Sequence, residues 1–564
     1  MSRSARGLLV VLAAMSLVAA ACGSDDEPAA ESTAAPAASV TAAPGDDSET
    51  TEAAAETTPE TDAPEASAAA PEGTLRVNVA ALSSEVLDPK AFLSADQYFY
   101  LPIVFDSLFV VDPETGATAP GLATDAEMSD DGLTLTLTLR DGVKFHDGSP
   151  FTAEDVKFSI ERYIAEGSTA VSAARIKAMI KEITVVDDHT LTITSEAGMP
   201  TILADLTMNP GSTSGFVVPK AYVESVGDEE FQRNPIGTGP FKFESHEVGR
   251  SMTFTANEDY WGEVPHVAEL QLELVADAAT RLSNLTAGTT DLVPDVAGPA
   301  ILQVEGDSNL QTFTTPGAQV AYMIIGGKAN PDSPLSNADV RNALSMAIDR
   351  EGIIESLLFG RAQPAYLFMF PTSFGWPDNG DELTIPYDPD AAKALLETAG
   401  FGDGFDIGVV ARPSDADPAG AIAQNLTAIG LNAEVTILDP AEWLKNMQDD
   451  AAQDSTRISL SALPYRYDIT SSMLNHYHSS ATTYGQPHSD AELDDWVLKG
   501  TTEPNQDKRE EFVRQAVTRA FEEDMFLPLW YVDAVFGASS NIESWTPLPG
   551  AREPLNLQSV VLAD

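Results

Sequence analysis

Residues 139–156 read LRDGVKFHDGSPFTAEDV, and the order of elements in this stretch decides the fold class. The stretch begins at the end of residues 133–139, LTLTLTL, whose strict alternation of apolar and polar side chains predicts a half-buried strand. Gly142 and Gly148 fit tight turns after that strand. His146 lies between the two glycines, and we interpret it as a hydrogen-bonded turn residue rather than a catalytic base.

The second half of the stretch predicts the start of a helix. Thr152 is a good N-cap, Asp155 stands at the third helical position, and Phe151 can pack on Val156 across the cap. Val156 and Ile160 then repeat at helical spacing. A strand, two turns and a capped helix therefore follow one another directly.

The same signals recur along the chain. We expect a helix capped by Ser336 and another that begins at Asp388-Pro389 and ends at Gly400. Further alternating strands are predicted at residues 75–79, 190–194, 270–274 and 320–325. Because strands and helices interleave without an internal repeat, we predict an α/β fold rather than an all-β sandwich or a helix bundle.

The composition excludes several classes of function. The chain has 564 residues with 87 Asp+Glu against 31 Lys+Arg, a formal net charge of −56. Such a chain repels phosphate backbones, so we expect no nucleic-acid partner. Its single cysteine excludes an intramolecular disulfide and a Cys-based zinc or iron–sulfur site.

The first residues look like a targeting segment. Residues 1–21 carry Arg3 and Arg6 before an apolar run that is too short to span a bilayer, which indicates a signal peptide. Residues 18–23, VAAACG, resemble a bacterial lipobox with Cys22 as the lipidated residue. The sequence therefore predicts a lipoprotein held to a membrane through Cys22.

Residues 22–72 have a different composition from the rest. They hold 16 Ala and 13 Asp+Glu, without Lys, Arg or aromatic residues. Such a segment cannot bury enough apolar surface to offset its ordering entropy. We interpret it as a disordered, acidic, Ala-rich tether, which leaves 74 Asp+Glu and 29 Lys+Arg for the body that follows.

Several motifs in the body together carry a family resemblance. The stretch at residues 139–156 closely resembles the signature of family 5 extracellular solute-binding proteins, the peptide- and nickel-type receptors of ABC importers. Other matching segments follow in order: Leu87-Asp88-Pro89, Phe105–Leu108, Pro120–Ala123, Asn234–Phe241, Asn257–Gly262, Asp339–Leu344, Ala347–Arg350, Tyr387–Pro389, Ala399–Phe401 and Leu527–Leu529. The resemblance covers residues 73–564.

The resemblance implies a two-lobed periplasmic-binding-protein-like fold with a hinge between the lobes and an extra domain on lobe I. Carried over, lobe I takes residues 73–115, 233–320 and 525–564. The extra domain takes residues 116–232, and lobe II takes residues 321–524. A ligand would be enclosed where the lobes close.

The function implied is solute capture without chemistry. The chain would bind a small solute, most simply a short peptide, and deliver it to an ABC permease and ATPase complex from the outer face of the bacterial cytoplasmic membrane. We expect a monomer without a cofactor or a bound metal. The rival classes are a secreted hydrolase and an adhesion or signalling lipoprotein. Residues 211–215, GSTSG, have Thr where a hydrolase elbow needs its nucleophile, and neither a His-Glu-x-x-His motif nor a P-loop is present.

The resemblance also points to ligand-binding residues in lobe II. In peptide-binding relatives an Asp of the second lobe, in a short Asp-Pro stretch after a strand, binds the α-ammonium group. Asp468 is the best match here, although Ile469 replaces the usual proline. Arg466 could pair with a ligand carboxylate or with Asp468. Further ligand-binding candidates are Tyr465, Tyr467 and, on the strand at residues 320–325, Tyr322.

Two other ligand classes stay open on the sequence alone. His476, Tyr477 and His478 raise the alternative of a nickel chelate, since imidazole suits nickel. Oligosaccharides are the other alternative, because some relatives take them and aromatic rings stack on sugars.

Overall fold

A computed structural model of the chain describes residues 70–112, 117–170, 172–208, 212–448, 456–480, 488 and 490–563. The predicted signal peptide, Cys22 and the predicted tether up to residue 69 lie outside these residues. Glu72, the last residue of the predicted tether, donates its backbone N–H to the carbonyl oxygen of His266 at 2.9 Å. Within the described ranges, every helix is too short or too polar to cross a membrane.

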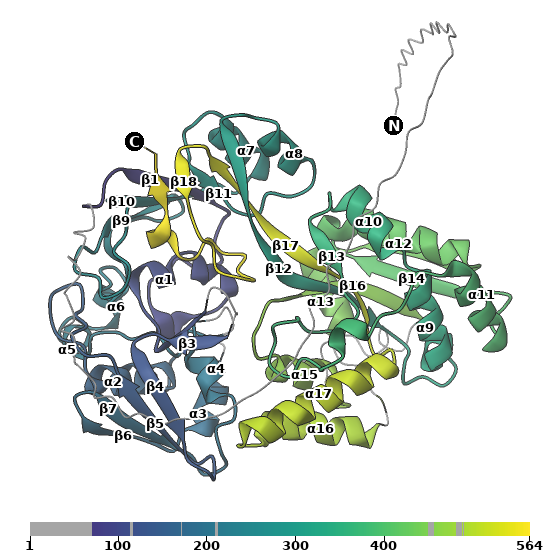
Figure 1. The fold of residues 1–564 in the computed structure, drawn as a ribbon, viewed down its shortest axis with the longest axis horizontal. Helices are drawn as coiled ribbons and strands as arrows, with labels where there is room; N and C mark the ends of the chain where they lie inside the picture. The colour runs from purple at the N-terminus through teal and green to yellow at the C-terminus, as the bar shows by residue number, and fades with distance from the viewer. Residues whose placement is uncertain are drawn as a thin grey trace, which may run out of the picture. The chain divides into compact units, whose positions relative to one another are not determined.

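One large mixed sheet of eleven strands organises the body (Figure 1). Its order is β15 (Asn432–Ile437), β14 (Asp406–Ala411), β16 (Arg457–Pro464), β12 (Leu310–Ile325), β17 (Leu527–Ser539), β11 (Leu292–Val293), β1 (Thr74–Val79), β10 (Glu269–Leu274), β9 (Ser251–Ala256) and β8 (Phe241–Glu247), with β13 (Ala362–Pro364) also on β17. Pairing is parallel between β1 and its neighbours and between β14 and its neighbours, and antiparallel elsewhere.

The two longest strands, β12 and β17, connect two hydrophobic cores. They have 16 and 13 residues and pair antiparallel with each other. Ala318 and Phe536 pack in the same core as Val77, whereas Met323 and Leu527 pack in a second core with β14 and β16. In Figure 1 the two strands run side by side from the part of the sheet with β11 to the part with β16. Any hinge between the two cores therefore includes these strands.

The first core extends into a separate antiparallel sheet of four strands. Its order is β4 (Ala123–Met128), β5 (Thr134–Leu139), β7 (Thr190–Thr194) and β6 (Glu182–Asp187). Nearby elements are β2 (Phe109–Val111), β3 (Thr118–Pro120), α1 (Leu101–Val104), α2 (Ala153–Tyr163), α3 (Ala173–Met179), α4 (Ile202–Leu206), α5 (Lys220–Val226) and α6 (Asp228–Phe231). Leu137 and Ile193 face the core because alternate strand residues point to the same side.

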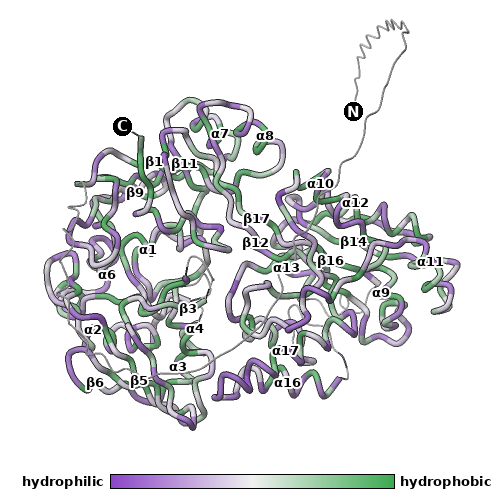
Figure 2. The backbone as a smooth tube through the Cα atoms, in the orientation of Figure 1, coloured by the Kyte–Doolittle hydropathy of each residue, from purple (hydrophilic) through white to green (hydrophobic). Residues whose placement is uncertain are grey.

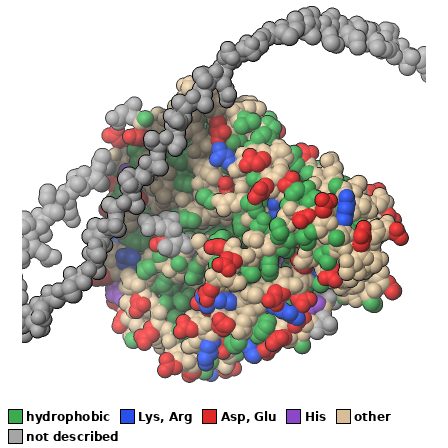
Figure 3. All heavy atoms as spheres, turned by 45° about the vertical axis from the view of Figure 1, so that its right-hand side comes forward, with side chains coloured by type: hydrophobic (Ala, Val, Ile, Leu, Met, Phe, Trp, Pro, Cys, Tyr) green, Lys and Arg blue, Asp and Glu red, His purple; other side chains and the backbone are tan. Residues whose placement is uncertain are grey.

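Helices accompany the remaining strands. They are α7 (Ala278–Thr286), α8 (Pro299–Glu305), α9 (Ala338–Ala347), α10 (Arg350–Leu357), α11 (Pro389–Thr398), α12 (Ala416–Ala428), α13 (Pro440–Gln448), α15 (Thr470–His476), α16 (Ala491–Thr502) and α17 (Gln506–Glu522), and a short pair β18 (Ile542–Ser544) and β19 (Val561–Leu562) completes the chain. Figure 2 shows α16 and α17 alternating between hydrophilic and hydrophobic residues, as expected of helices with one buried face. Acidic side chains are spread over the face seen in Figure 3.

Local capping rules located two helix starts correctly and one incorrectly. Thr152 and Asp155 form a capping box at α2, and the Asp388 carboxylate caps α11 with Pro389 at its first position. The prediction that Ser336 caps the next helix was wrong by one residue. Asn337 caps α9 by accepting from the Asp339 backbone, because residues Pro334–Ser336 form a 3-10 turn of their own.

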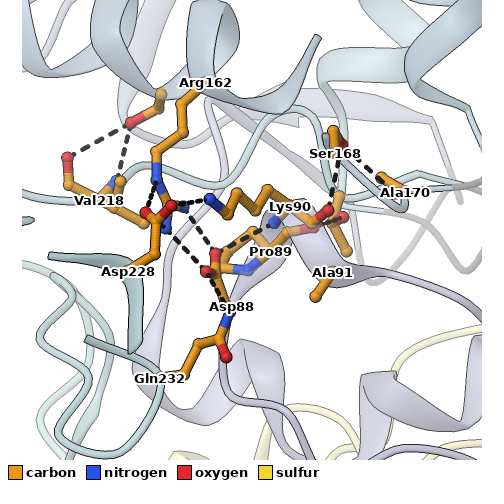
Figure 4. A network of polar contacts seen from close by, with 12 residues as sticks. Asp88, Pro89, Lys90, Ala91, Arg162, Ser168, Ala170, Val218, Asp228 and Gln232 are labelled. Carbon is orange, nitrogen blue, oxygen red and sulfur yellow. Dashed lines mark hydrogen bonds and ion pairs between the residues drawn. The ribbon is translucent and has the colours of Figure 1, made fainter. Parts of the chain in front are cut away.

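The motif at Leu87-Asp88-Pro89 is held by a buried charge network (Figure 4). Arg162 of α2 donates two hydrogen bonds of 2.7 Å to the Asp88 carboxylate, which is fully buried. Asp228 of α6 accepts from the same guanidinium and pairs with Lys90. The network thus links the start of the body to α2 and α6.

His146 joins two of the sequence motifs. Gly237 donates its backbone N–H to Nδ1 of His146 at 3.3 Å, so Nε2 carries the proton and donates to the Gly239 carbonyl at 3.0 Å. The interpretation of His146 as a hydrogen-bonded turn residue is confirmed. Burial lowers its pKa to about 4, which keeps the ring neutral at physiological pH.

We expect the His146→Gln variant to lose less stability in acid than the native protein does. The folded pKa of about 4 lies below the ordinary 6.5, so the unfolded chain binds the extra proton between these values. His146 therefore removes up to about 1.4 kcal/mol of unfolding free energy per pH unit as pH falls through this window. Urea unfolding from pH 7 to 4 measures the slope. His266→Gln is the control, because that side chain is 42% exposed, and equal slopes in all three proteins would contradict the prediction.

Candidate functional site

A pocket of about 910 Å³, with the solvent at its mouth included, brings together segments that are far apart in the sequence. The lining residues are Val111, Thr118, Arg175, Thr201, Ala204, Asp205, Thr207, Met208, Tyr465, Arg466, Tyr467, Asp468, Thr470, Leu548, Pro549, Gly550, Ala551 and Leu555. Four of the five predicted ligand-binding residues, at positions 465–468, therefore lie in one pocket.

The loop that carries these four residues runs from the end of β16 to the start of α15. Asp468 fixes its end, because its Oδ1 accepts from the backbone N–H and the hydroxyl of Thr470 at 2.9 and 2.6 Å. Its Oδ2 accepts from Arg509 of α17, whose side chain is 2% exposed. Burial acts to raise the pKa of Asp468, but the Arg509 charge and the Thr470 hydrogen bonds outweigh it and lower that pKa. The carboxylate is thus ionised and already neutralised.

Arg466 differs from Asp468 in having no ion-pair partner among the described residues. Of the two partners considered above, Asp468 is taken by Arg509. Its backbone carbonyl accepts from the Ser373 hydroxyl, and the residue is part of the pocket lining. Burial, and next the nearby charge of Arg175, lower the pKa of Arg466 from its very high ordinary value, so it stays charged. An uncompensated guanidinium in a pocket is a ready partner for a carboxylate.

A second arginine in the pocket is fully paired. Arg175 of α3 donates to both carboxylate oxygens of Asp205 on α4, with one distance of 2.6 Å. Burial raises the pKa of Asp205, and Arg175 opposes that rise. This pair was not predicted, because nothing in the local sequence around residues 175 and 205 marks them as partners.

Tyr465 and Tyr467 form another part of the pocket lining. Tyr465 packs on Phe370 with ring centroids 5.0 Å apart and shares a hydrogen bond of 3.0 Å with Thr372. Tyr467 lies beside Phe374. Gly550, at φ +65°, approaches Tyr465 so closely that an added Cβ would lie 2.4 Å from the ring. The segment around Gly550 therefore needs a glycine to pass over this ring.

The Gly550→Ala variant is expected to weaken ligand binding by about tenfold, because the methyl group must displace Tyr465 or the segment itself. Gly142→Ala is a matched control: its φ is +76°, yet no atom lies within 4 Å of an added Cβ. Both variants carry the same backbone strain, and only the first reaches the pocket. Calorimetric titration compares them, and equal affinities would show that the Tyr465 position is not important for binding.

Tyr322, the fifth predicted ligand-binding residue, lies away from the pocket lining. Its side chain is 1% exposed, its ring packs on Phe368, and its hydroxyl shares a hydrogen bond of 3.0 Å with Nε2 of His476. His476 is buried as well, and burial lowers its pKa to about 4.

The other two residues considered for a nickel chelate are also engaged within the protein. Tyr477 is buried, and Nδ1 of His478 lies 2.7 Å from the Ser480 hydroxyl. Across the described ranges, no three His, Cys, Asp or Glu side chains are grouped so that they could hold a metal ion.

Three parts of the pocket escaped sequence reasoning: the Arg175–Asp205 pair, the Arg509 anchor and the segment at residues 548–555. The segment contributes an apolar wall of Leu548, Ala551 and Leu555. The one signal in the sequence that could have marked Arg175 and Arg509 is the scarcity of basic residues, because the chain has only 31 Lys+Arg against 87 Asp+Glu.

Comparisons with known proteins agree on the class of the chain. Heme-binding protein A of Haemophilus influenzae is 32% identical over 367 residues, which is 60% of this chain and 66% of the relative. The dipeptide-binding protein of Escherichia coli is 29% identical over 395 residues, 66% of this chain and 73% of the relative. A crystal structure of an ABC transporter substrate-binding protein of Listeria monocytogenes superposes with a TM-score of 0.76 at 24% identity, covering 88% of this chain and all of that one.

The structural match shows that this chain has the predicted two-lobed fold of periplasmic binding proteins, built as mixed α/β. Residues 117–485 match the middle region that defines the bacterial extracellular solute-binding proteins of family 5. That family binds solutes for ABC transporters and is not a family of enzymes. The chain therefore belongs to the bacterial extracellular solute-binding proteins of family 5.

Proposed function

We propose that this protein captures a short peptide in the pocket described above and delivers it to an ABC importer. The observation that carries the proposal is Arg466, a half-buried cation that lines the pocket and has no ion-pair partner among the described residues. A peptide offers a carboxylate for that cation, and its side chains suit the apolar part of the lining.

The names of two relatives bear on this proposal, one in favour of a peptide and one in favour of another ligand. One is named a dipeptide-binding protein and one a heme-binding protein. The pocket contains a cation for a carboxylate, whereas His476, the candidate ligand for a metal, is buried and hydrogen-bonded outside the lining. The pocket chemistry thus favours a peptide.

The proposed roles of the site residues follow from their contacts. Arg466 binds a carboxylate, and Tyr465 and Tyr467 contact the body of the ligand. Asp468 lines the pocket and positions the loop through Arg509 and Thr470. Tyr322 supports the loop from beneath through the core that contains His476. No group in this set is arranged as a nucleophile with a general base, and we propose that the ligand leaves unchanged.

The lobes are proposed to divide as the resemblance implies, at residues 73–115, 233–320 and 525–564 for lobe I, 116–232 for the extra domain and 321–524 for lobe II. The lining supports this division, because residues from all three parts meet in the pocket. Closure around β12 and β17 would bring the sides of the pocket together.

The test is to identify what the purified protein binds. Native mass spectrometry detects the solute that copurifies, and calorimetry then measures dipeptides, hemin, a nickel–histidine chelate and an oligosaccharide separately. We expect a peptide to be bound and to stay intact after incubation. Binding of hemin, the chelate or the sugar in place of every peptide would overturn the proposal, and a cleaved peptide would show an enzyme.

We also propose that Cys22 anchors a monomeric receptor to the outer face of the membrane. The Cys22→Ala variant is expected to move from the membrane fraction to the medium, because a signal peptide alone does not leave a lipid on the mature chain. Fractionation with a lipid-labelled control measures this. If the variant stays membrane-bound, Cys22 is not the anchor.

A further inference from the structure

The pocket has one uncompensated positive charge and no uncommitted carboxylate among its described lining residues. Among the described lining residues, the acidic ones are Asp205 and Asp468. Arg175 pairs with both oxygens of Asp205, and Arg509 with Thr470 engages both oxygens of Asp468. The cation that is left over is Arg466.

This arrangement disfavours a free ammonium group on the ligand. An α-ammonium that enters the pocket loses water, and it meets Arg466 and Arg175 rather than a free anion. The two arginines already lie close enough for the charge of Arg175 to lower the pKa of Arg466. Adding a third cation to this site would increase the repulsion, whereas a carboxylate would relieve it.

The other walls are apolar. Leu548, Ala551 and Leu555 line the pocket from the segment at residues 548–555. Val111 lines it from β2 in predicted lobe I, and Met208 lines it from the predicted extra domain. A ligand that matches these walls has a carboxylate at one end and an apolar body.

We infer that the pocket selects anionic solutes, namely short apolar peptides with a free carboxylate and a blocked or absent α-amine, over zwitterionic peptides. The inference rests on the proposed function and names the substrate class of the same pocket. The pocket recognises the net charge of the ligand. Arg466 carries an uncompensated positive charge, whereas the carboxylates of Asp468 and Asp205 are already neutralised by other arginines.

Four probes of nearly the same shape test it: leucyl-leucine, N-acetyl-leucyl-leucine, the des-amino analogue that has hydrogen in place of the ammonium group, and N-acetyl-leucyl-leucine amide. Calorimetry with the purified full-length protein measures each Kd. We expect both anionic probes to bind at least tenfold more tightly than the zwitterion and the neutral amide. The des-amino analogue separates the effect of charge from the added bulk of the acetyl group.

An Arg466→Gln variant provides a second readout. We expect it to reduce the preference for the acetylated acid over the zwitterion to within twofold, whereas a purely structural defect would weaken both probes equally and keep their ratio. A zwitterion that binds the native protein as tightly as the anionic probes would overturn the inference and leave the proposed peptide function standing. If none of the four probes binds, the inference is overturned, and the titrations under the proposed function decide separately whether any peptide is bound.

Discussion

Replacing Arg466 by Gln is expected to raise the Kd for N-acetyl-leucyl-leucine by roughly 100-fold. The variant keeps a hydrogen-bond donor of similar reach but loses the charge that faces the carboxylate. Removing one partner of a buried charged pair costs about 2–5 kcal/mol of binding free energy, and about 2.7 kcal/mol corresponds to this factor. Calorimetric titration of native and variant proteins gives both values directly.

A matched substitution at Arg250 controls for the general effect of removing an arginine. Its side chain is 78% exposed, and Glu247, three residues away, is its ion-pair partner among the described residues. We expect Arg250→Gln to bind the probe within about twofold of the native protein, since exposed ion pairs contribute little. A comparable loss in both variants would mean that the effect comes from net charge and not from the pocket.

The second large effect is expected on stability, at the network in Figure 4. Arg162→Met removes the cation that neutralises Asp88, whose carboxylate is fully buried. Leaving a buried charge without its partner destabilises a protein by about 3–5 kcal/mol. Urea unfolding followed by circular dichroism should therefore show a clearly lower midpoint for this variant.

Two further variants serve as controls for the Arg162→Met result. Arg233→Met removes an exposed pair with Glu229, with side chains 63% and 84% exposed, and should cost less than about 1 kcal/mol. The double variant Asp88→Asn with Arg162→Met should be more stable than Arg162→Met alone, because the orphaned charge is gone. An Arg162→Met midpoint equal to that of Arg233→Met would contradict the assignment of a buried pair.

Much of the fold could be predicted because its signals are local. Thr152 with Asp155, and Asp388 with Pro389, cap helices through residues within one turn, and residues 190–194 alternate along a single strand. The error at Ser336 has the same origin. Both Ser336 and Asn337 can cap, and the choice depends on the 3-10 turn at Pro334–Ser336, which packs Leu335 into the core.

The same difference between local signals and contacts between distant segments decides which parts of the candidate site could be predicted. The loop at residues 465–468 could be named because a family resemblance marks it, and all four of its residues line the pocket. The pairing of Asp468 with Arg509, and of Arg175 with Asp205, depends on packing between segments 41 and 30 residues apart. Tyr322 was chosen for its strand, but the direction in which its ring points is set by Phe368 and His476.

The position of residues 548–555 in the pocket has a consequence for how the protein is made. Ribosomes and export channels release a chain from its first residue onward, so this wall arrives after the other segments that line the pocket. The large sheet also cannot be completed before β17 is made, because β17 pairs with β11, β12 and β13. A chain interrupted before Leu548 would lack one side of the pocket. Ligand capture thus begins only after residues 548–555 have been made, and a receptor that lacks them cannot compete for solute with one that has them.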